Sequence, residues 1–151
     1  MSTTPYRAYL ESRVVSASPL QLVHLAYEGA INAISEAREH LANKRIFERS
    51  KAITKAQLIV IELQKSLDFN KGGELAVQLN GIYDYVRRLL IDGNFRQIEA
   101  PFAEAQQLLQ TLDESWKALG ESQNVVPAAA LSAPWQNAGD GLPASRTSFQ
   151  L

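Results

Sequence analysis

Two acid–histidine pairs are the residues of this chain best suited to chemistry, because together they could ligate a metal ion. His24 and Glu28 lie four residues apart, as do Glu36 and His40, so each pair occupies one face of a helix. Helical bundles that bind metals place Glu and Glu-x-x-His side chains at core positions. Here the core positions are apolar and no Glu-x-x-His occurs. We therefore expect histidines that face solvent or lie at a helix end, and no metal site.

Other catalytic signatures are also missing from the sequence. There is no Cys, which excludes disulfides, thiolate metal sites and cysteine nucleophiles. The Gly72-Gly73 pair precedes a helical pattern, but no Lys-Ser/Thr follows it, so a turn is favoured over a phosphate-binding loop. We expect no enzyme activity and no cofactor.

Composition narrows the class of protein and of partner. The 151 residues are 46% hydrophobic and 21% charged, which is typical of one globular domain. The net charge of -1 disfavours binding to nucleic acid or to an anionic membrane. No apolar run is long enough for membrane insertion, and residues 1–13 do not look like a signal peptide. We expect a cytoplasmic protein.

The first helical pattern has clear signals at both ends. Ser18 suits an N-cap, Pro19 suits the first helical position, and Gln21 stands where a capping-box partner belongs. Asn43 suits the end of this helix. An apolar stripe with steps of three and four residues joins the two ends.

Three further patterns of about 20 residues follow, with similar stripes. The second is expected to end before a turn at residues 70–73, the third at Gly93, and the fourth just before Gly120, with Pro101 in its first turn. We therefore predict an all-α fold, an antiparallel up-down four-helix bundle over residues 18–120. The expected stripes are Leu20, Val23, Tyr27, Ala30, Ile34, Ala37 and Leu41; Ile46, Ile53, Ala56, Val60, Leu63 and Leu67; Leu75, Leu79, Ile82, Val86 and Leu89; and Phe102, Ala105, Leu109, Leu112, Trp116 and Leu119.

Two segments flank the expected bundle. Residues 121–151 contain three of the six prolines and no helical or strand periodicity, so we expect a flexible tail. Residues 1–17 carry Tyr6 and Tyr9 at helical spacing, which favours a short lid. It covers either one end of the bundle or a binding groove.

The second and third helices carry more apolar surface than one core stripe needs. This surplus indicates an enlarged core, a fifth segment packed there, or a groove for a partner helix or extended peptide. The residues concerned are Ala52, Leu58, Ile59 and Ile61 on the second helix, and Ala76, Tyr83, Tyr85 and Leu90 on the third.

Several short motifs occur in a fixed order over residues 6–118. They are Tyr6-x-x-Tyr9, Ser16-Ala17-Ser18-Pro19-x-x-Leu22, Tyr27-Glu28-Gly29-Ala30, Leu67-Asp68-Phe69, Gly72-Gly73-Glu74 and Tyr83-Asp84-Tyr85. In types and order these motifs resemble the flagellar secretion chaperone family FliS. The sequence departs from that family's pattern at Leu20, Ala26, Leu89 and Gly93.

The resemblance implies a four-helix chaperone that binds the disordered C-terminal segment of flagellin and prevents its premature polymerisation. It also implies presentation of the client to the cytoplasmic domain of the export gate. The free protein is then expected to be a monomer or weak homo-dimer. Two alternatives are a homo-oligomeric adaptor that buries its spare faces on itself and, less well supported, a bundle enzyme. The expected flagellin contacts are Tyr6, Tyr9, Ala52, Leu58, Ile59, Ile61, Ala76, Tyr83, Tyr85 and Leu90.

Overall fold

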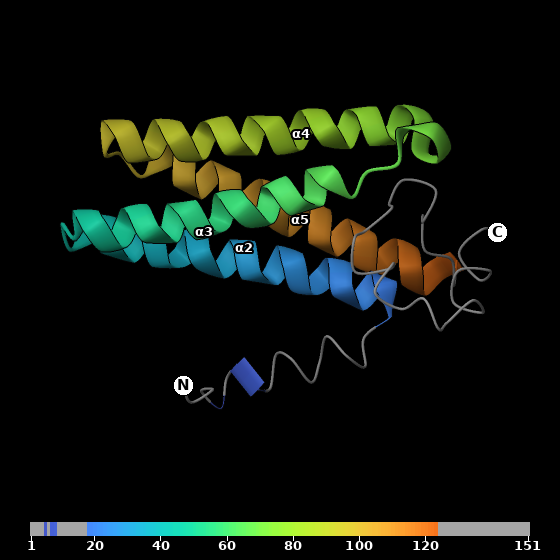
Figure 1. Ribbon diagram of the computed structural model, residues 1–151, viewed down its shortest axis with the longest axis horizontal. Coiled ribbons are helices and arrows are strands. Elements are labelled where there is room, and N and C mark those ends of the chain that lie inside the picture. The colour runs from blue at the N-terminus through green and yellow to red at the C-terminus, as the bar shows by residue number, and fades with distance from the viewer. Residues whose placement is uncertain (1–4, 6, 9–17, 124–151) are drawn as a thin grey trace.

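The computed structural model describes residues 5, 7, 8 and 18–123, with side chains to residue 120. Its elements are α2 (Pro19–Ala42), α3 (Ile46–Lys65), α4 (Phe69–Arg96) and α5 (Ala100–Gln123). Each helix packs against its neighbours in chain order, and α5 also packs against α2, so the four close a ring (Figure 1). The connections are only three residues long, so successive helices run antiparallel. The predicted all-α four-helix arrangement is confirmed.

The start of α2 is built as its sequence predicts. The Ser18 hydroxyl accepts a hydrogen bond from the Gln21 backbone N–H at 3.2 Å, and the Gln21 side chain accepts one from the Ser18 N–H at 2.8 Å. Pro19 occupies the first helical position, where a missing N–H has no cost. Asn43 caps the other end. The capping box and the C-cap therefore set both ends of this helix.

The expected turn at residues 70–73 is only partly correct, because residues 69–72 form a helical turn and the break in helical geometry is at Gly73. Asp68 caps α4, because its carboxylate accepts from the backbone N–H groups of Asn70 and Lys71, both at 3.0 Å. One helical turn follows, and the axis then kinks at Gly73, where φ is 52° and ψ is −125°. A residue with a Cβ is strained at this φ, so a glycine is needed where the first helical turn meets the main part of α4.

Two other expected helix ends are wrong. Gly93 lies inside α4, which continues to Arg96 and is closed by Gln97 in the left-handed conformation. Gly120 likewise lies inside α5. Pro101 is in the first turn of α5, as predicted. Glycine is common just beyond helix ends, but at position 93 a close contact with Phe102 of α5 accounts for it instead.

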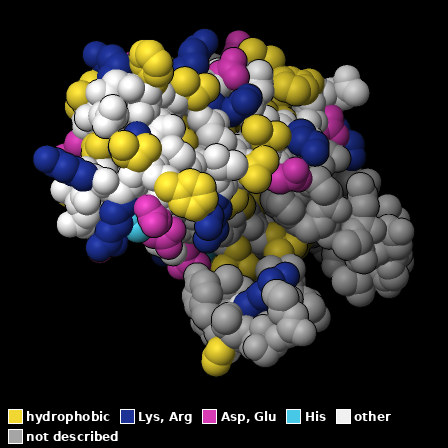
Figure 2. All heavy atoms as spheres, turned by 60° about the vertical axis from the view of Figure 1, so that its left-hand side comes forward, with side chains coloured by type: hydrophobic (Ala, Val, Ile, Leu, Met, Phe, Trp, Pro, Cys, Tyr) yellow, Lys and Arg dark blue, Asp and Glu magenta, His cyan; other side chains and the backbone are white. Residues whose placement is uncertain are grey.

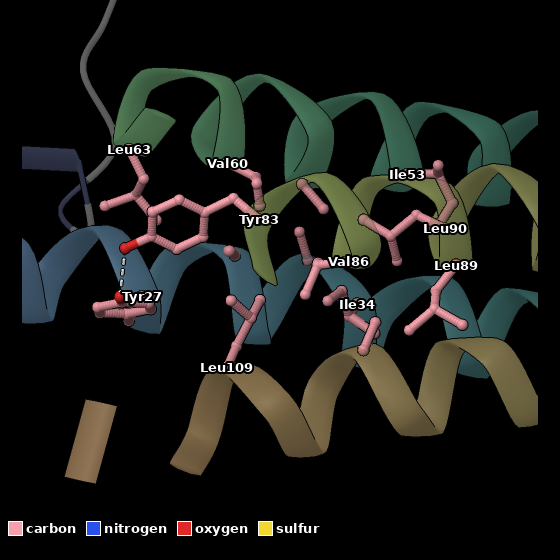
Figure 3. Packing of buried hydrophobic residues seen from close by; sticks show 14 of the residues in the cluster. Tyr27, Ile34, Ile53, Val60, Leu63, Tyr83, Val86, Leu89, Leu90 and Leu109 are labelled. Carbon is pink, nitrogen blue, oxygen red and sulfur yellow. Dashed lines mark hydrogen bonds between the residues drawn. The ribbon is translucent and has the colours of Figure 1, made fainter. Parts of the chain in front are cut away.

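The core runs along the axis of the bundle, and Figure 3 shows its middle part. The stripes of α2 and α5 were predicted well. On α3, Ile46 was expected in the core but is exposed at the start of the helix. On α4, Leu75 is exposed and Ile82 only half-buried, so part of the predicted stripe was wrong. The core residues of α4 are Ala76, Leu79, Tyr83, Val86, Leu89, Leu90 and Gly93.

Candidate functional site

Four of the residues predicted for a binding groove lie in the core instead. Ala52, Ala76, Tyr83 and Leu90 are all buried, which corrects the expectation that they form a spare surface line. The surplus on α4 is an enlarged core, because its small Ala76 and hydrogen-bonded Tyr83 fit between the helices. Tyr6 and Tyr9, the predicted lid contacts, lie outside the described residues.

Two of the predicted residues of α3, Leu58 and Ile59, line a shallow surface groove, whereas Ile61 lies outside it. Leu58 is 58% exposed, and Ile59 and Ile61 are half-buried. The groove has a volume of about 550 Å³. Its lining runs along one face of the helix and is mostly apolar, although it includes two lysine side chains. The lining residues are Phe47, Ser50, Lys51, Thr54, Lys55, Leu58 and Ile59.

Contacts on the two sides of α3 determine which face of the helix carries this groove. Gln57 and Gln64 point towards Arg87 of α4. Gln57 donates to the Arg87 backbone carbonyl at 2.9 Å and accepts from its Nε at 3.2 Å, and Gln64 accepts from its Nη1 at 3.0 Å. On the α2 side, Ile59 packs against Gly29. A Cβ added to that glycine would lie 3.3 Å from the Ile59 Cδ1. The face carrying Leu58 is therefore left to solvent.

A second apolar surface lies at the end of the bundle where α3 begins and α4 ends. Phe95 is 84% exposed and Phe47 is 70% exposed, and Ile46, Ile91 and Ile98 accompany them. In Figure 2 hydrophobic side chains stand in separate patches among Lys, Arg, Asp and Glu side chains on the face that includes this end. Large exposed apolar side chains at one end of the bundle are candidates for contact with a partner.

A buried arginine fixes the two helix ends that carry this cluster. Arg49 of α3 is 4% exposed and donates from Nε to the Asn94 side-chain oxygen at 2.8 Å. Its Nη2 also donates to the Asn94 backbone carbonyl at 3.3 Å. The last carbonyls of α4 form the negative end of the helix dipole, which favours a cation there.

The exposed side chains at this end of the bundle were not predicted from the sequence. We call them the bundle-end cluster, and its members are Ile46, Phe47, Ile91, Phe95 and Ile98. The predicted end of the third helix at Gly93 leaves Phe95 and Ile98 outside the helical patterns. Ile46 was assigned to the core, and Phe47 lay off its stripe. The signal that could have identified this surface is an aromatic residue off the core stripe and next to a helix end.

The remaining predicted residue, Tyr85, lies on the exposed side of α4. Its hydroxyl donates to the Glu104 carboxylate of α5 at 2.5 Å, and this hydrogen bond raises the pKa of Tyr85 above its ordinary value. The phenol ring is 41% exposed, so Tyr85 can offer an apolar edge to a partner.

Tyr83 belongs to a buried hydrogen-bonded chain that joins three helices. The Trp116 indole N–H of α5 donates to the Tyr27 hydroxyl of α2 at 2.9 Å, and that hydroxyl lies 2.5 Å from the Tyr83 hydroxyl of α4 (Figure 3). Burial raises the pKa of Tyr27 to about 12 and that of Tyr83 well above its ordinary value. Both phenols stay neutral at physiological pH, so the chain supports the core and offers no activated nucleophile.

The histidines do not form a metal centre in the described residues. His24 was expected to face solvent, but it is half-buried and its Nδ1 lies 2.8 Å from a carboxylate oxygen of Asp113. Within residues 18–120 and the three described earlier ones, no group of three potential His, Cys, Asp or Glu ligands comes together. None of the helices described is long and apolar enough to span a membrane.

Comparison with known proteins identifies the family. The family model described as "Flagellar protein FliS" matches residues 2–123. The flagellar secretion chaperone FliS of Salmonella typhimurium is 38% identical over 109 residues, covering 72% of this chain and 81% of the relative. That of Campylobacter jejuni is 30% identical over 120 residues, covering 80% and 94%. FliSB of Pseudomonas aeruginosa is 30% identical over 107 residues, covering 71% and 85%. These relatives are chaperones by name rather than enzymes, and the chain belongs to the FliS family of flagellar proteins.

Proposed function

We propose that this chain is a cytoplasmic export chaperone that binds the disordered C-terminal segment of flagellin. Membership of the FliS family supports a flagellar export role. One observation carries the choice of mechanism: the core is closed, yet large apolar side chains remain exposed on α3 and at the bundle end. A segment whose apolar face must later pair in a filament can lie against such surfaces.

The proposed contacts are the members of the predicted set that can reach a partner. Leu58, Ile59 and Ile61 offer the α3 face and Tyr85 offers α4, and the bundle-end cluster extends this surface. Tyr6 and Tyr9 are retained as proposed lid contacts. The buried residues of the predicted set are not proposed as contacts, because a client would have to open the core to touch them.

The proposed mechanism is masking without covalent chemistry or nucleotide. Flagellin held in this way cannot use its terminal segment for polymerisation and stays unfolded enough for export. A disordered segment that folds on binding spends part of its interaction energy on ordering, so affinity per unit area is modest and release remains easy. Release is proposed to take place at the cytoplasmic domain of the export gate.

The direct test is capture of flagellin with and without its C-terminal segment. We expect purified chaperone to retain full-length flagellin and to lose the truncated form. Equal capture of both forms would contradict the proposal.

A variant pair tests the proposed surface. Leu58→Asp should weaken capture while leaving the circular dichroism spectrum unchanged, because this side chain is exposed. Gln110→Asp, an exposed change on α5, is the matched control and should bind as the wild type does. A concentration-dependent dimer that loses its self-association through Leu58→Asp would instead favour the homo-oligomeric adaptor.

A further inference from the structure

The groove on α3 has a mostly apolar lining that includes two lysine side chains. Phe47, Leu58 and Ile59 supply apolar surface, and Lys51 and Lys55 stand one helical turn apart among them. The Lys51 ammonium lies 5.4 Å from the centre of the Phe47 ring, so the two share one part of the groove. An aromatic face attracts a cation, which keeps this ammonium close to the apolar lining.

Among the described residues, neither lysine has a carboxylate partner of its own. Over the residues that the structure describes, no acidic oxygen lies within ion-pair distance of either ammonium group. Glu48 precedes Lys51 by three residues and makes no ion pair with it there. By contrast, Lys65 at the end of the same helix pairs with Glu62 at 3.2 Å. Two like charges one turn apart repel each other, and this arrangement favours an anionic partner.

The dimensions of the groove suit a short helix. The lining residues extend over 47–59, so the twelve steps of ~1.5 Å span about 18 Å. That is the length of about three helical turns. Lining positions recur at steps of three and four residues, which presents the ridges and grooves into which a second helix packs.

We propose that this groove binds a helical part of the flagellin C-terminal segment that carries two carboxylates one turn apart, facing Lys51 and Lys55. The inference rests on the proposed function and adds the chemistry of recognition to it. The apolar edge of the client helix covers Leu58 and Ile59, and its acidic flank pairs with the two lysines. Because the pairs lie beside an apolar lining, client contact removes part of their water, and the attraction is stronger than between fully exposed charges.

A charge reversal tests the inference in the full-length chain. The double variant K51E/K55E should weaken binding of the flagellin C-terminal segment by about tenfold or more at low salt, as opposed charges become like charges. The gap between wild type and variant should shrink as ionic strength rises, because partly exposed charges are screened. Glutamate is also a good helix former, so the variant is expected to keep its circular dichroism spectrum.

The matched control carries the same change in net charge elsewhere. K71E/K117E alters two exposed lysines on α4 and α5, away from the groove, and should bind within about twofold of the wild type. The decisive arm is a charge swap: a flagellin segment with lysines at its paired acidic positions should bind K51E/K55E better than it binds the wild type.

The outcomes separate the two proposals. Wild-type binding that is unchanged in K51E/K55E, or weakened equally by the control, overturns this inference and leaves the proposed function standing. Failure of the wild type to bind flagellin at all overturns both. If K51E/K55E changes self-association instead, the occupant is a second copy of the chain. If removal of residues 124–151 abolishes the charge effect, it is the chain's own tail. Either result overturns the assignment to flagellin.

Discussion

Replacing Tyr27 with phenylalanine should cost much more stability than replacing Tyr83, although both hydroxyls belong to one buried hydrogen-bonded chain. The reason is that the chain contains three donor groups, the Trp116 N–H and the two phenolic O–H groups, but only two hydrogen bonds. Trp116 donates to Tyr27, and one of the two phenols donates to the other. In the described part of the structure, one phenolic hydrogen is therefore already without an acceptor.

The magnitudes follow from counting what each substitution leaves behind. Tyr27→Phe removes both hydrogen bonds and leaves the Trp116 N–H and the Tyr83 O–H buried without acceptors. With about 1 kcal/mol for each of the two lost bonds and about 1–3 kcal/mol for the one additional orphaned donor, the loss is about 3–5 kcal/mol. Tyr83→Phe removes one bond and still leaves one unpaired hydrogen, so its cost is about 1 kcal/mol or less.

The assay is urea unfolding followed by circular dichroism at 222 nm, which avoids the signals of the two tryptophans. The double variant gives the sharpest test, because removing Tyr83 from the Tyr27→Phe background also removes an orphaned hydroxyl. We expect the double variant to be at least as stable as Tyr27→Phe alone. Equal costs for the two single changes, or costs that add in the double variant, would refute this hydrogen-bond accounting.

Three further outcomes are expected. Gly93→Ala should lower the free energy of unfolding by about 1–2 kcal/mol, because its Cβ would lie 2.7 Å from the buried Phe102 ring. Gly81→Ala, in open space on the same helix, should raise the free energy of unfolding by up to ~1 kcal/mol. Thermal unfolding of the two variants checks both signs. The free energy of unfolding should stay constant below pH 10 and fall between about pH 10 and 12, because the two core tyrosines keep their protons when folded and lose them more readily when unfolded. Urea midpoints measured across this pH range test the expectation. A flat profile would contradict the raised pKa values. Removing residues 124–151 should leave the melting temperature within a few degrees, and a larger drop would make the tail part of the fold.

Local signals in the sequence predicted the helices well where side chains cap the backbone. Ser18, Gln21 and Asn43 set the ends of α2 through contacts within a few residues, so no tertiary information was needed. Glycines were less informative. Gly93 is explained by a ring on another helix, and nothing near it in the sequence distinguishes that cause from a helix end.

The register of α4 could not be settled from periodicity. Leu75, Ile82 and Leu89 form one apolar line, and Ala76, Tyr83 and Leu90 form another beside it. The helix buries the second line together with Leu89, because a small side chain at 76 and a phenol with a partner on α2 fit the space available. That choice also decided which predicted site residues reached the surface.

Gly73 and Gly93 lie in the same helix and resist substitution for opposite reasons. Around Gly73 nothing lies within 4 Å of an added Cβ, so only its backbone angles exclude side chains, whereas Gly93 has helical angles but no space. Inverting the signs of φ and ψ at Gly73 gives a conformation that ordinary L-residues adopt in extended chains. A D-alanine introduced there by chemical ligation would therefore fit without strain. It would also restrict the backbone of the unfolded chain and so stabilise the folded protein, which the natural L-amino acids do not achieve at this position.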